Sequence, residues 1–361
     1  MVVMLGVDVH KDTHTVVGAD EVGLELAART VRATDAGHRQ LVAWARAQFP
    51  QQRTWAVEDC RHVSGRLERA LLAAGERVVR VAPKLMAGAR RSARTRGKSD
   101  PIDALAVARA ALREPNLPVA EHDEASRELK LLVDHRENLL AERTRMINRL
   151  RWHLHELDPE LDPPARRLGQ LARLDELAGW LDQHAAALER PRERQASMVT
   201  RLARELVADI RALTVRVNAL EREITTLVAQ AAPRLTELLG CGALTAAKIV
   251  GETANPARFR SEACFAMHAG VAPIPASSGR TNRHRLARGG NRQLNAALHR
   301  IALTQLGQSG SLGQVYYHRR RAAGDTSMEA LRALKRRLAR VVYNMLTPTT
   351  TSTTGDQPVA A

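Results

Sequence analysis

The 361-residue sequence predicts an N-terminal α/β domain, a long all-α middle region and a mostly helical C-terminal domain. Three observations lead to this fold class. Strand-like and helix-like segments alternate over residues 1–113, whereas residues 124–232 are helical and charged throughout. From residue 233 to residue 346, Gly-rich turns separate short helical segments. Residues 347–361 are rich in Thr and low in complexity, so we expect them to form a disordered tail.

The first domain begins with three strand-like segments that Gly and Asp separate, as in a meander of hairpins. A helix follows, then a strand, a helix, a strand, a basic loop and a last helix. This is the order of a ribonuclease-H-like, RuvC-like fold, which we therefore expect, with another α/β arrangement as the alternative. The expected strands are 1–9, 14–20, 24–34, 53–59 and 77–83, the helices are 35–48, 64–75 and 101–113, and the basic loop is 88–100.

The middle region carries a long apolar seam. We expect residues 114–122 to form a linker, with breaks in the following helices near 158–164 and 189–194. Apolar residues spaced alternately by four and three have a period of about 3.5, which indicates a coiled coil. Such a seam either joins copies of the chain into a homo-oligomer, a dimer or tetramer, or closes a helical hairpin within one chain. Its members are Leu206, Ile210, Leu213, Val217, Leu220, Ile224 and Leu227.

The amino-acid composition indicates which classes of partner to expect. A formal net charge of +16 is expected of a protein that binds a polyphosphate such as DNA. Three scattered cysteines, Cys60, Cys241 and Cys264, are too few for a disulfide framework or a zinc cluster, which favours reduced thiols in a cytoplasmic protein. No signal peptide is expected, and no apolar run is long enough to cross a membrane, so we expect no membrane partner. Aromatic residues make up only 3%, which argues against a base-stacking surface.

Four acidic residues are placed to converge. Asp8 ends the first strand and Glu58 ends the fourth, and these strands are neighbours in a ribonuclease-H-like sheet. Asp100 and Asp103 lie three residues apart at the start of the last helix, so they share a face that packs over those strand ends. Phosphodiester cleavage by two Mg²⁺ ions needs several carboxylates at one point. The four acids therefore predict a magnesium site.

Each acid also has a simpler explanation. Asp8 could cap a turn, Asp100 could be a helix N-cap before Pro101, and Glu58 could be a solvated strand end with Asp59 beside it. Glu58 is preferred over Asp59 although alternation leaves the choice open by one place. The joint placement favours the metal site. The polar residues next to Asp8 fit either an assisting role or a surface turn: His10, Lys11, Asp12 and His14.

Two features of the C-terminal domain point to phosphate chemistry. Residues 235–252 resemble a helix-hairpin-helix around Gly240 and Gly242, whose backbone N–H groups would face a phosphate, although a tight turn explains them equally. Ser277 and Ser278 follow a Pro-containing turn and precede an Arg-rich stretch at 280–300. Arginines would stabilise the charge that develops when a serine attacks phosphorus. Taken alone, Ser-Ser-Gly is typical of a polar loop.

Several motifs together resemble one family. GVDVHKDTH, the AVE strand, KSDPIDALAVA and GVAPIPASSGRTNR…RGGNRQLNAALHRIA resemble the IS110 family of insertion-sequence transposases, in the right order over about residues 3 to 345. The resemblance implies a RuvC-like domain with a DEDD acid set, a coiled-coil linker and a C-terminal domain with a catalytic serine. It carries the acid set onto Asp8, Glu58, Asp100 and Asp103. The serine falls on Ser278, directly before Gly279, with Ser277 as the second choice. The resemblance further implies a structured guide RNA as a partner.

The sequence thus predicts a DNA transposase or recombinase that excises and inserts a mobile element with a Mg²⁺-dependent acid site and a serine nucleophile. The alternative is a RuvC-like nuclease or resolvase in which the acids alone cleave DNA. A third possibility, from another class, is a non-catalytic DNA- or RNA-binding regulator.

Overall fold

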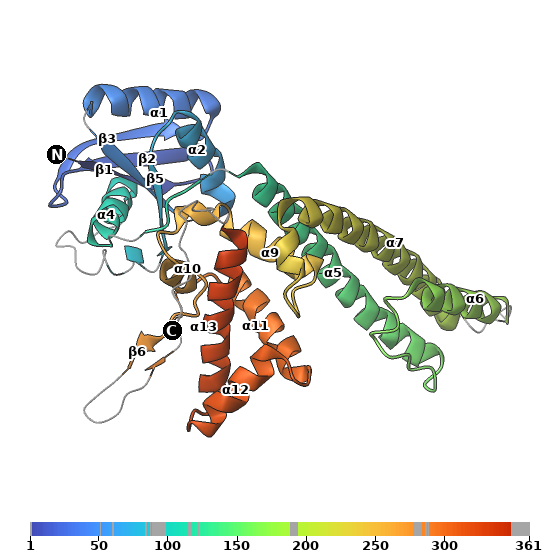
Figure 1. The fold of residues 1–361 in the computed structure, drawn as a ribbon. Helices are drawn as coiled ribbons and strands as arrows, with labels where there is room; N and C mark the ends of the chain where they lie inside the picture. The colour runs from blue at the N-terminus through green and yellow to red at the C-terminus, as the bar shows by residue number, and fades with distance from the viewer. Residues whose placement is uncertain are drawn as a thin grey trace. The chain divides into compact units, whose positions relative to one another are not determined.

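The computed structural model describes residues 2–50, 52–59, 61–83, 85–86, 88, 99–114, 117–121, 123–187, 194–276, 284–285, 287 and 289–347. The chain forms two compact units. One holds the segments before residue 125 and after residue 251, with Leu238–Gly240, and the other holds Ala125–Glu237 and Cys241–Gly251. Figure 1 shows the elements of both units in chain order.

The N-terminal segment folds around a five-stranded mixed sheet. The strand order is β3-β2-β1-β4-β5, with antiparallel pairing among β1 to β3 and parallel pairing of β4 with β1 and β5. The predicted meander followed by alternating helices and strands is thus confirmed, and the sheet is consistent with a RuvC-like domain. The elements are β1 (Val3–Val9), β2 (Thr13–Ala19), β3 (Glu25–Arg32), α1 (Asp35–Gln48), β4 (Arg53–Glu58), α2 (Arg61–Ala73), β5 (Val78–Val81) and α4 (Asp100–Arg113).

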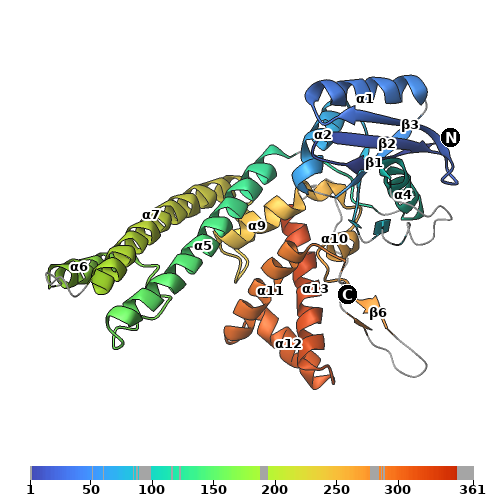
Figure 2. The same cartoon turned by 180° about the vertical axis from the view of Figure 1, so that it is seen from behind.

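Helices cover both faces of this sheet (Figures 1 and 2). Alternate residues of β1, such as Leu5 and Val7, pack with the apolar side chains of α1 and α2. The opposite face packs on α4 through Ala56, Val79 and the alanines of that helix. Gly6 allows α4 to approach closely, because a Cβ there would lie 2.1 Å from the carbonyl oxygen of Ala104. The start of α4 is therefore held against the ends of β1 and β4.

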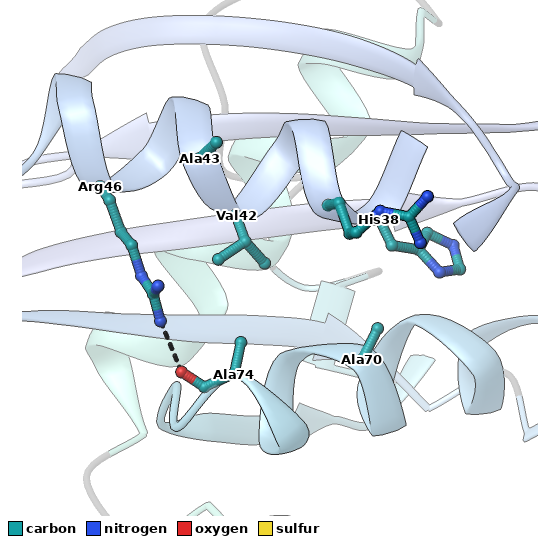
Figure 3. Close-up of a pocket in the computed structure, with 7 residues that line it drawn as sticks. His38, Val42, Ala43, Arg46, Ala70 and Ala74 are labelled. Carbon is teal, nitrogen blue, oxygen red and sulfur yellow. Dashed lines mark hydrogen bonds between the residues drawn. The ribbon is translucent and has the colours of Figure 1, made fainter. Parts of the chain in front are cut away.

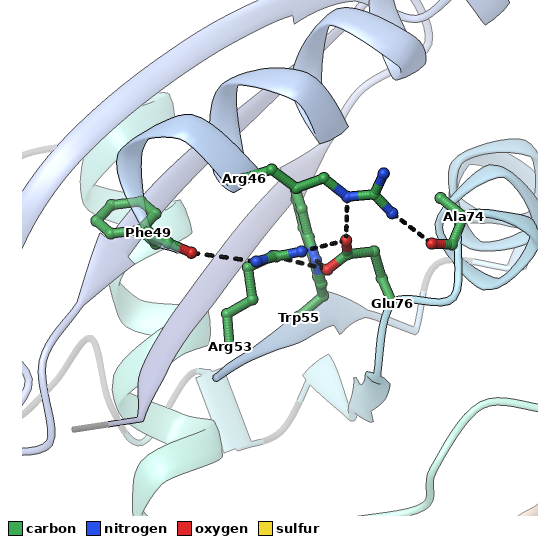
Figure 4. Close-up of polar contacts among 6 residues, drawn as sticks. All are labelled: Arg46, Phe49, Arg53, Trp55, Ala74 and Glu76. Atoms are coloured by element: carbon green, nitrogen blue, oxygen red, sulfur yellow. Dashed lines mark hydrogen bonds and ion pairs between the residues drawn. The ribbon is translucent and has the colours of Figure 1, made fainter. Parts of the chain in front are cut away.

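The buried carboxylate of Glu76 links the sheet to α1. Glu76, just before β5, accepts hydrogen bonds from Arg53 Nε (2.8 Å), Trp55 Nε1 (2.9 Å) and Arg46 Nε (3.1 Å) (Figure 4). Burial alone would raise the pKa of Glu76, but the hydrogen bonds from Arg53, Trp55 and Arg46 hold this pKa below its usual value. The ionised carboxylate thereby satisfies an indole N–H that would otherwise be buried without a partner.

The segment predicted as a linker is partly attached to the sheet. Val119 forms an antiparallel bridge with Val79, and the N–H of Ala120 donates to the carbonyl oxygen of Val78 at 2.8 Å. The reason is that β5 is an edge strand, whose outward backbone groups need partners. Pro118–Ala120 of the predicted linker, residues 114–122, thus pair with the sheet edge, and Pro115, Asn116 and His122 lie outside the described residues.

The second unit is built on two long antiparallel helices. Its elements are α5 (Glu124–Leu157), α6 (Leu171–Ala187), α7 (Arg194–Ala231) and most of α9 (Ala243–Thr253). Arg136 of α5 pairs with Glu221 of α7 at 2.6 Å, and Arg143 further along α5 bonds Thr214, earlier in α7, at 3.1 Å. Rising numbers in one helix thus match falling numbers in the other, as the predicted breaks require.

The apolar seam of α7 is filled from within the same chain. Leu213 and Val217 pack against Leu139 of α5, and Ile210 packs in a second cluster with residues of α5 and α6. Ile210, Leu213, Val217 and Ile224 are at most 7% exposed. Of the two uses left open by the sequence, the helical hairpin is the one these contacts form.

Short helices make up the C-terminal part. They are α8 (Pro233–Thr236), α10 (Glu262–His268), α11 (Arg292–Gly307), α12 (Leu312–Ala322) and α13 (Ser327–Leu346), with a two-residue strand pair, β6 (Ile274–Pro275) and β7 (His284–Arg285). The helix before Gly240 is a single turn, because Pro233 ends α7 and leaves only four residues helical. The segment predicted as a helix-hairpin-helix thus has the four-residue α8 before Gly240 and the eleven-residue α9 after Gly242. No helix among the described residues is long and apolar enough to cross a membrane.

Two of the three cysteines can be placed. Cys241 is buried, which raises the pKa of its thiol to about 12, and Cys264 is half-buried. Both thiols are free, as expected for reduced cysteines. Cys60 and the tail residues 348–361 lie outside the described residues.

Candidate active site

The sheet places Asp8 and Glu58 beside each other. Val7 of β1 is in register with Val57 of the parallel strand β4, so the next residues of the two strands are also neighbours. Glu58 shares the face of Ala56, which packs on the α4 side, and Asp8 shares the face of Gly6. Asp59 follows the last residue of β4, and its N–H donates to the carbonyl oxygen of Val81 at 2.9 Å. Asp8 is 4% exposed, and Glu58 is half-buried.

The first turn of α4 brings the other two acids to this face. Ser99 is the N-cap, so Asp100 is the first helical residue and not the cap, and Pro101 follows it where no N–H is needed. Asp103 is 6% exposed, whereas Asp100 is exposed. Both carboxylates lie where the positive end of the helix dipole favours negative charge.

A histidine bridges the strand and the helix. His10 Nε2 lies 3.1 Å from Asp8 Oδ2 and 3.6 Å from Asp100 Oδ1. One ligand atom from each of Asp8, His10 and Asp100 lies within 4.8 Å of the others. The pKa of Asp8 is raised, first by burial and then by the nearby charges of Asp103 and Asp100, while His10 opposes this. A cation would offset the repulsion among these carboxylates.

This donor set fits a divalent cation. Carboxylate oxygens are the ligands preferred by Mg²⁺, and an imidazole nitrogen is also accepted by Mn²⁺ and other transition ions. Asp103 lies close enough to raise the pKa of Asp8, after the larger effect of burial, and Glu58 ends the strand next to β1, but neither residue is part of the three-residue ligand group. Of the four predicted acids, Asp8 and Asp100 therefore lie close enough to share an ion with His10.

Ser277 and Ser278 lie outside the described residues. The short strands before and after them can be described. Ile274 of β6 pairs with Arg285 of β7, and Pro275 pairs with His284, in antiparallel register. The serine segment therefore connects two paired strands of the C-terminal part.

Comparison with known proteins identifies the family. A model of the DEDD domain of IS110, described as Transposase, matches residues 5–159, and a model described as Transposase IS116/IS110/IS902 family matches residues 232–318. The insertion element IS110 uncharacterized 43.6 kDa protein of Streptomyces coelicolor is 32% identical over 69% of this chain and 70% of its own length. This chain belongs to the IS110 transposase family.

Two further relatives align over nearly the whole IS110-family chain. The insertion element IS116 uncharacterized 44.8 kDa protein of Streptomyces clavuligerus is 29% identical over 95% of this chain and 94% of its own length. The insertion element IS900 uncharacterized 42 kDa protein of Mycobacterium paratuberculosis is 27% identical over 95% of each chain. The predicted family is thus confirmed. Membership implies a transposase that acts on DNA and a DEDD site that uses a divalent metal.

The RGGN motif of this IS110-family transposase has a structural role. Gly290 touches Gly270, and a Cβ on Gly290 would lie 2.2 Å from the Cα of Gly270. Asn291 then caps α11 by accepting from the N–H groups of Gln293 and Leu294, while its Nδ2 donates to Glu252 Oε2 at 2.5 Å. The motif fixes the approach of α11 to the turn that leads into β6.

Sequence analysis gave two histidines of this transposase no definite role. His10 belongs to the ligand group, and its position two residues after Asp8, on the same strand face, was the signal. His14 is not part of a surface turn: it is 1% exposed and stacks on His38, on the α1 side of the sheet. His38 lines a cavity of about 280 Å³ between α1 and α2, as Figure 3 shows.

Proposed function

We propose that this IS110-family transposase excises and inserts a mobile element by cutting and rejoining DNA through a serine-linked intermediate. Asp8, Glu58, Asp100 and Asp103 would hold Mg²⁺, and Ser278, with Ser277 as the second choice, would be the nucleophile. The observation that carries the proposal is the approach of Asp8 and Asp100, from a strand end and a helix start, to the same imidazole at 3.1 and 3.6 Å.

The chain's own groups have separable tasks at the acid site. Bound Mg²⁺ would supply positive charge to the scissile phosphate and to the leaving oxygen. The pKa of Asp8 is raised first by burial and then by the charges of Asp103 and Asp100, so a bound cation would stabilise its ionised form. His10 holds the Asp8 carboxylate in one orientation through its hydrogen bond. Asp100 is exposed, so its carboxylate is accessible to a DNA strand.

The serine step conserves the number of phosphoester bonds. The hydroxyl oxygen of Ser278 forms a bond to phosphorus as the bond to one DNA oxygen breaks, and the serine proton ends on that leaving oxygen. A DNA hydroxyl later reverses the step, which releases the serine and joins the new strand. No nucleotide cofactor is needed, in keeping with a sequence that lacks a Walker-type phosphate loop.

The proposal includes partners. The net charge of +16 suits both DNA and the guide RNA that the family resemblance implies. Excision followed by insertion must hold two DNA sites at once, which favours a homo-oligomer, a dimer or tetramer, acting in the cytoplasm. The serine mechanism depends neither on the guide RNA nor on the number of subunits. Co-purification tests for the RNA, and light scattering measures the number of subunits.

Substitution at the acids tests the metal site. Asp8→Ala or Asp103→Ala should abolish recombination while DNA and RNA binding survive, because the change removes a metal ligand and no phosphate contact. Asp12→Asn, an exposed acid in the turn after β1, is the matched control and should retain activity. Full recombination by either alanine variant, or in excess EDTA, would contradict the acid site.

Substitution at the serine tests the covalent step. Ser278→Ala should leave binding intact and eliminate both recombination and a trapped protein–DNA adduct, and the adduct of the unmodified protein should map by mass spectrometry to the peptide containing Ala276–Gly279. A label on Ser277 moves the role by one residue. Recombination with both serines replaced would instead support a nuclease in which the acids alone cleave.

A further inference from the structure

A second cavity lies in the C-terminal part, and none of the four predicted acids lines it. Its volume is about 400 Å³, and it is bordered by the turn at Gly270–Pro273, by β7 and by one face of α12 and α13. Pro273 and His284 border it at the two ends of the segment that carries Ser277 and Ser278. Among the described residues, five cationic and two anionic side chains line it, besides His284.

The two acids of this cavity are already engaged. Asp325 pairs with Arg320 Nε at 2.6 Å. Glu329 completes the N-terminal cap of α13 by accepting from the N–H and the hydroxyl of Thr326, at 2.9 and 2.6 Å. A third acid, Glu262, pairs with Arg336 from outside the cavity lining, at 2.6 Å. These contacts balance Arg320 and Arg336, whereas Arg285, Arg332 and Lys335 form no ion pair with a carboxylate of the residues that the structure describes.

Lys335 is the clearest of these unbalanced cations. Its side chain lines the cavity, it is 8% exposed, and its Nζ donates at 2.9 Å to the amide oxygen of Asn295. Within the described part of the chain no carboxylate pairs with it. Burial, followed by the positive charge of Arg332 one turn earlier on α13, lowers the pKa of Lys335. A buried ammonium with a neutral partner and a cationic neighbour is stabilised by a bound anion.

The amide of Asn295 fixes this lysine to the turn before the serine segment. Its Nδ2 donates to the carbonyl oxygens of Ala269 and Gly270, at 3.1 and 3.0 Å, which directs its Oδ1 toward Lys335. Gly270 has a φ of 67°, a conformation that favours glycine. The ammonium is therefore held ready at a set position relative to β6.

We propose that this cavity binds a backbone phosphate of the DNA strand on which the serine acts, with Lys335 and Arg332 as its ligands and Arg285 at the rim. This inference rests on the proposed function, because the serine segment joins the strands at the edge of the cavity. The cavity exceeds the size of one phosphate, so it has room for the attached sugar. Lys335 and Arg332 are positioning residues, which set the register of the strand and take no part in bond making.

Binding without metal tests the site independently of catalysis. In EDTA and in the Ser278→Ala background, Arg332→Gln and Lys335→Met should each weaken binding of a short fluorescent DNA duplex by about tenfold, the loss of one charge-assisted contact. The slope of binding against salt should fall by about one for each lost phosphate contact. Arg234→Gln, which removes an exposed arginine of α8 outside the cavity and outside the Arg-rich stretch 280–300, is the control and should change binding far less.

Further measurements identify which molecule binds in the cavity. Thermal melting checks that each variant folds, and Lys335→Arg, which keeps the charge, should restore most of the binding if Lys335→Met is unstable. Equal losses for Arg234→Gln and Arg332→Gln would overturn the site. Losses with RNA of the same sequence but not with DNA would assign it to RNA, and thermal stabilisation by inorganic phosphate without any DNA effect would make it a free-anion site. Since binding is measured without metal or serine, failure here leaves the acid and serine tests unaffected.

Discussion

Two imidazoles buried on the α1 side of the sheet make the first domain sensitive to acid. Burial lowers the pKa of His14 from 6.5 to about 4, with smaller contributions from His38 and His10, and burial likewise lowers the pKa of His38. Both ring nitrogens of His38 and Nδ1 of His14 are buried without a hydrogen-bond partner. His14 is therefore protonated near pH 6.5 in the unfolded chain but only near pH 4 in the folded chain.

Stability should consequently be complete above about pH 6.5 and fall as the pH drops toward 4. For His14 the loss is on the order of 3 kcal/mol. His14→Phe keeps a ring against His38 and removes the titration, so its urea midpoint should depend less on pH over this window. His155→Gln, at an exposed position of α5, should retain the full dependence. If His14→Phe loses stability as steeply as the unmodified protein, another group is responsible.

Single residues differ in how far the sequence reveals their roles. The approach of Asp8 to Asp100 could be predicted from the sequence. Local patterns mark the end of the first strand and the start of the last helix, and the predicted topology places these two ends together. Glu58 was preferred over Asp59, and the register with β1 supplies the physical reason. Lys335 was not singled out, since a lysine on an amphipathic helix usually reaches water. Only the packing of α11 against α13 buries it.

At the scale of elements, the predicted strands and helices of the first domain agree with the structure to within a few residues. The signals used were local: alternation of apolar residues, Gly and Asp at the turns, and the Ser-Asp-Pro sequence at the start of α4. Tertiary packing does not override them. The bridge between Val119 and Val79 was missed, because pairing with an edge strand depends on a distant partner. The partner of the α7 seam was likewise open, since the same 3.5-residue period serves contacts within and between chains.

The hairpin of α5 and α7 makes a sharp prediction. Leu213→Glu places a charge in the cluster of Leu139 and Val217, so the free energy of unfolding should fall by about 3–5 kcal/mol, as measured by the helical circular dichroism signal in urea. Val215→Glu, two residues along α7 and 44% exposed, should change it by less than about 0.5 kcal/mol. An unchanged midpoint for Leu213→Glu with a smaller mass in light scattering would show that the seam joins separate chains.

At the scale of the whole molecule, charge and chemistry are separable. The excess of 16 positive charges is a property of the entire sequence, whereas the carboxylates that we propose as metal ligands are confined to the end of β1, the last residue of β4 and the start of α4. Positive charge draws in the phosphate backbone and carries little sequence information. Metal-site variants should therefore lose strand cleavage and keep DNA binding. The salt concentration should control the affinity for DNA.

The last prediction concerns that separation. Each phosphate neutralised by Lys or Arg releases counterions, so the logarithm of the DNA association constant should fall linearly with the logarithm of salt concentration. For about six to ten such contacts, affinity should drop by about 10³ or more between about 50 and about 200 mM salt. Fluorescence anisotropy of a labelled duplex in EDTA measures this. Asp8→Ala should give the same slope, because without metal this carboxylate touches no phosphate. A flat salt dependence would mean that the net charge does not serve DNA binding, and a changed slope in Asp8→Ala would place that carboxylate in the binding surface.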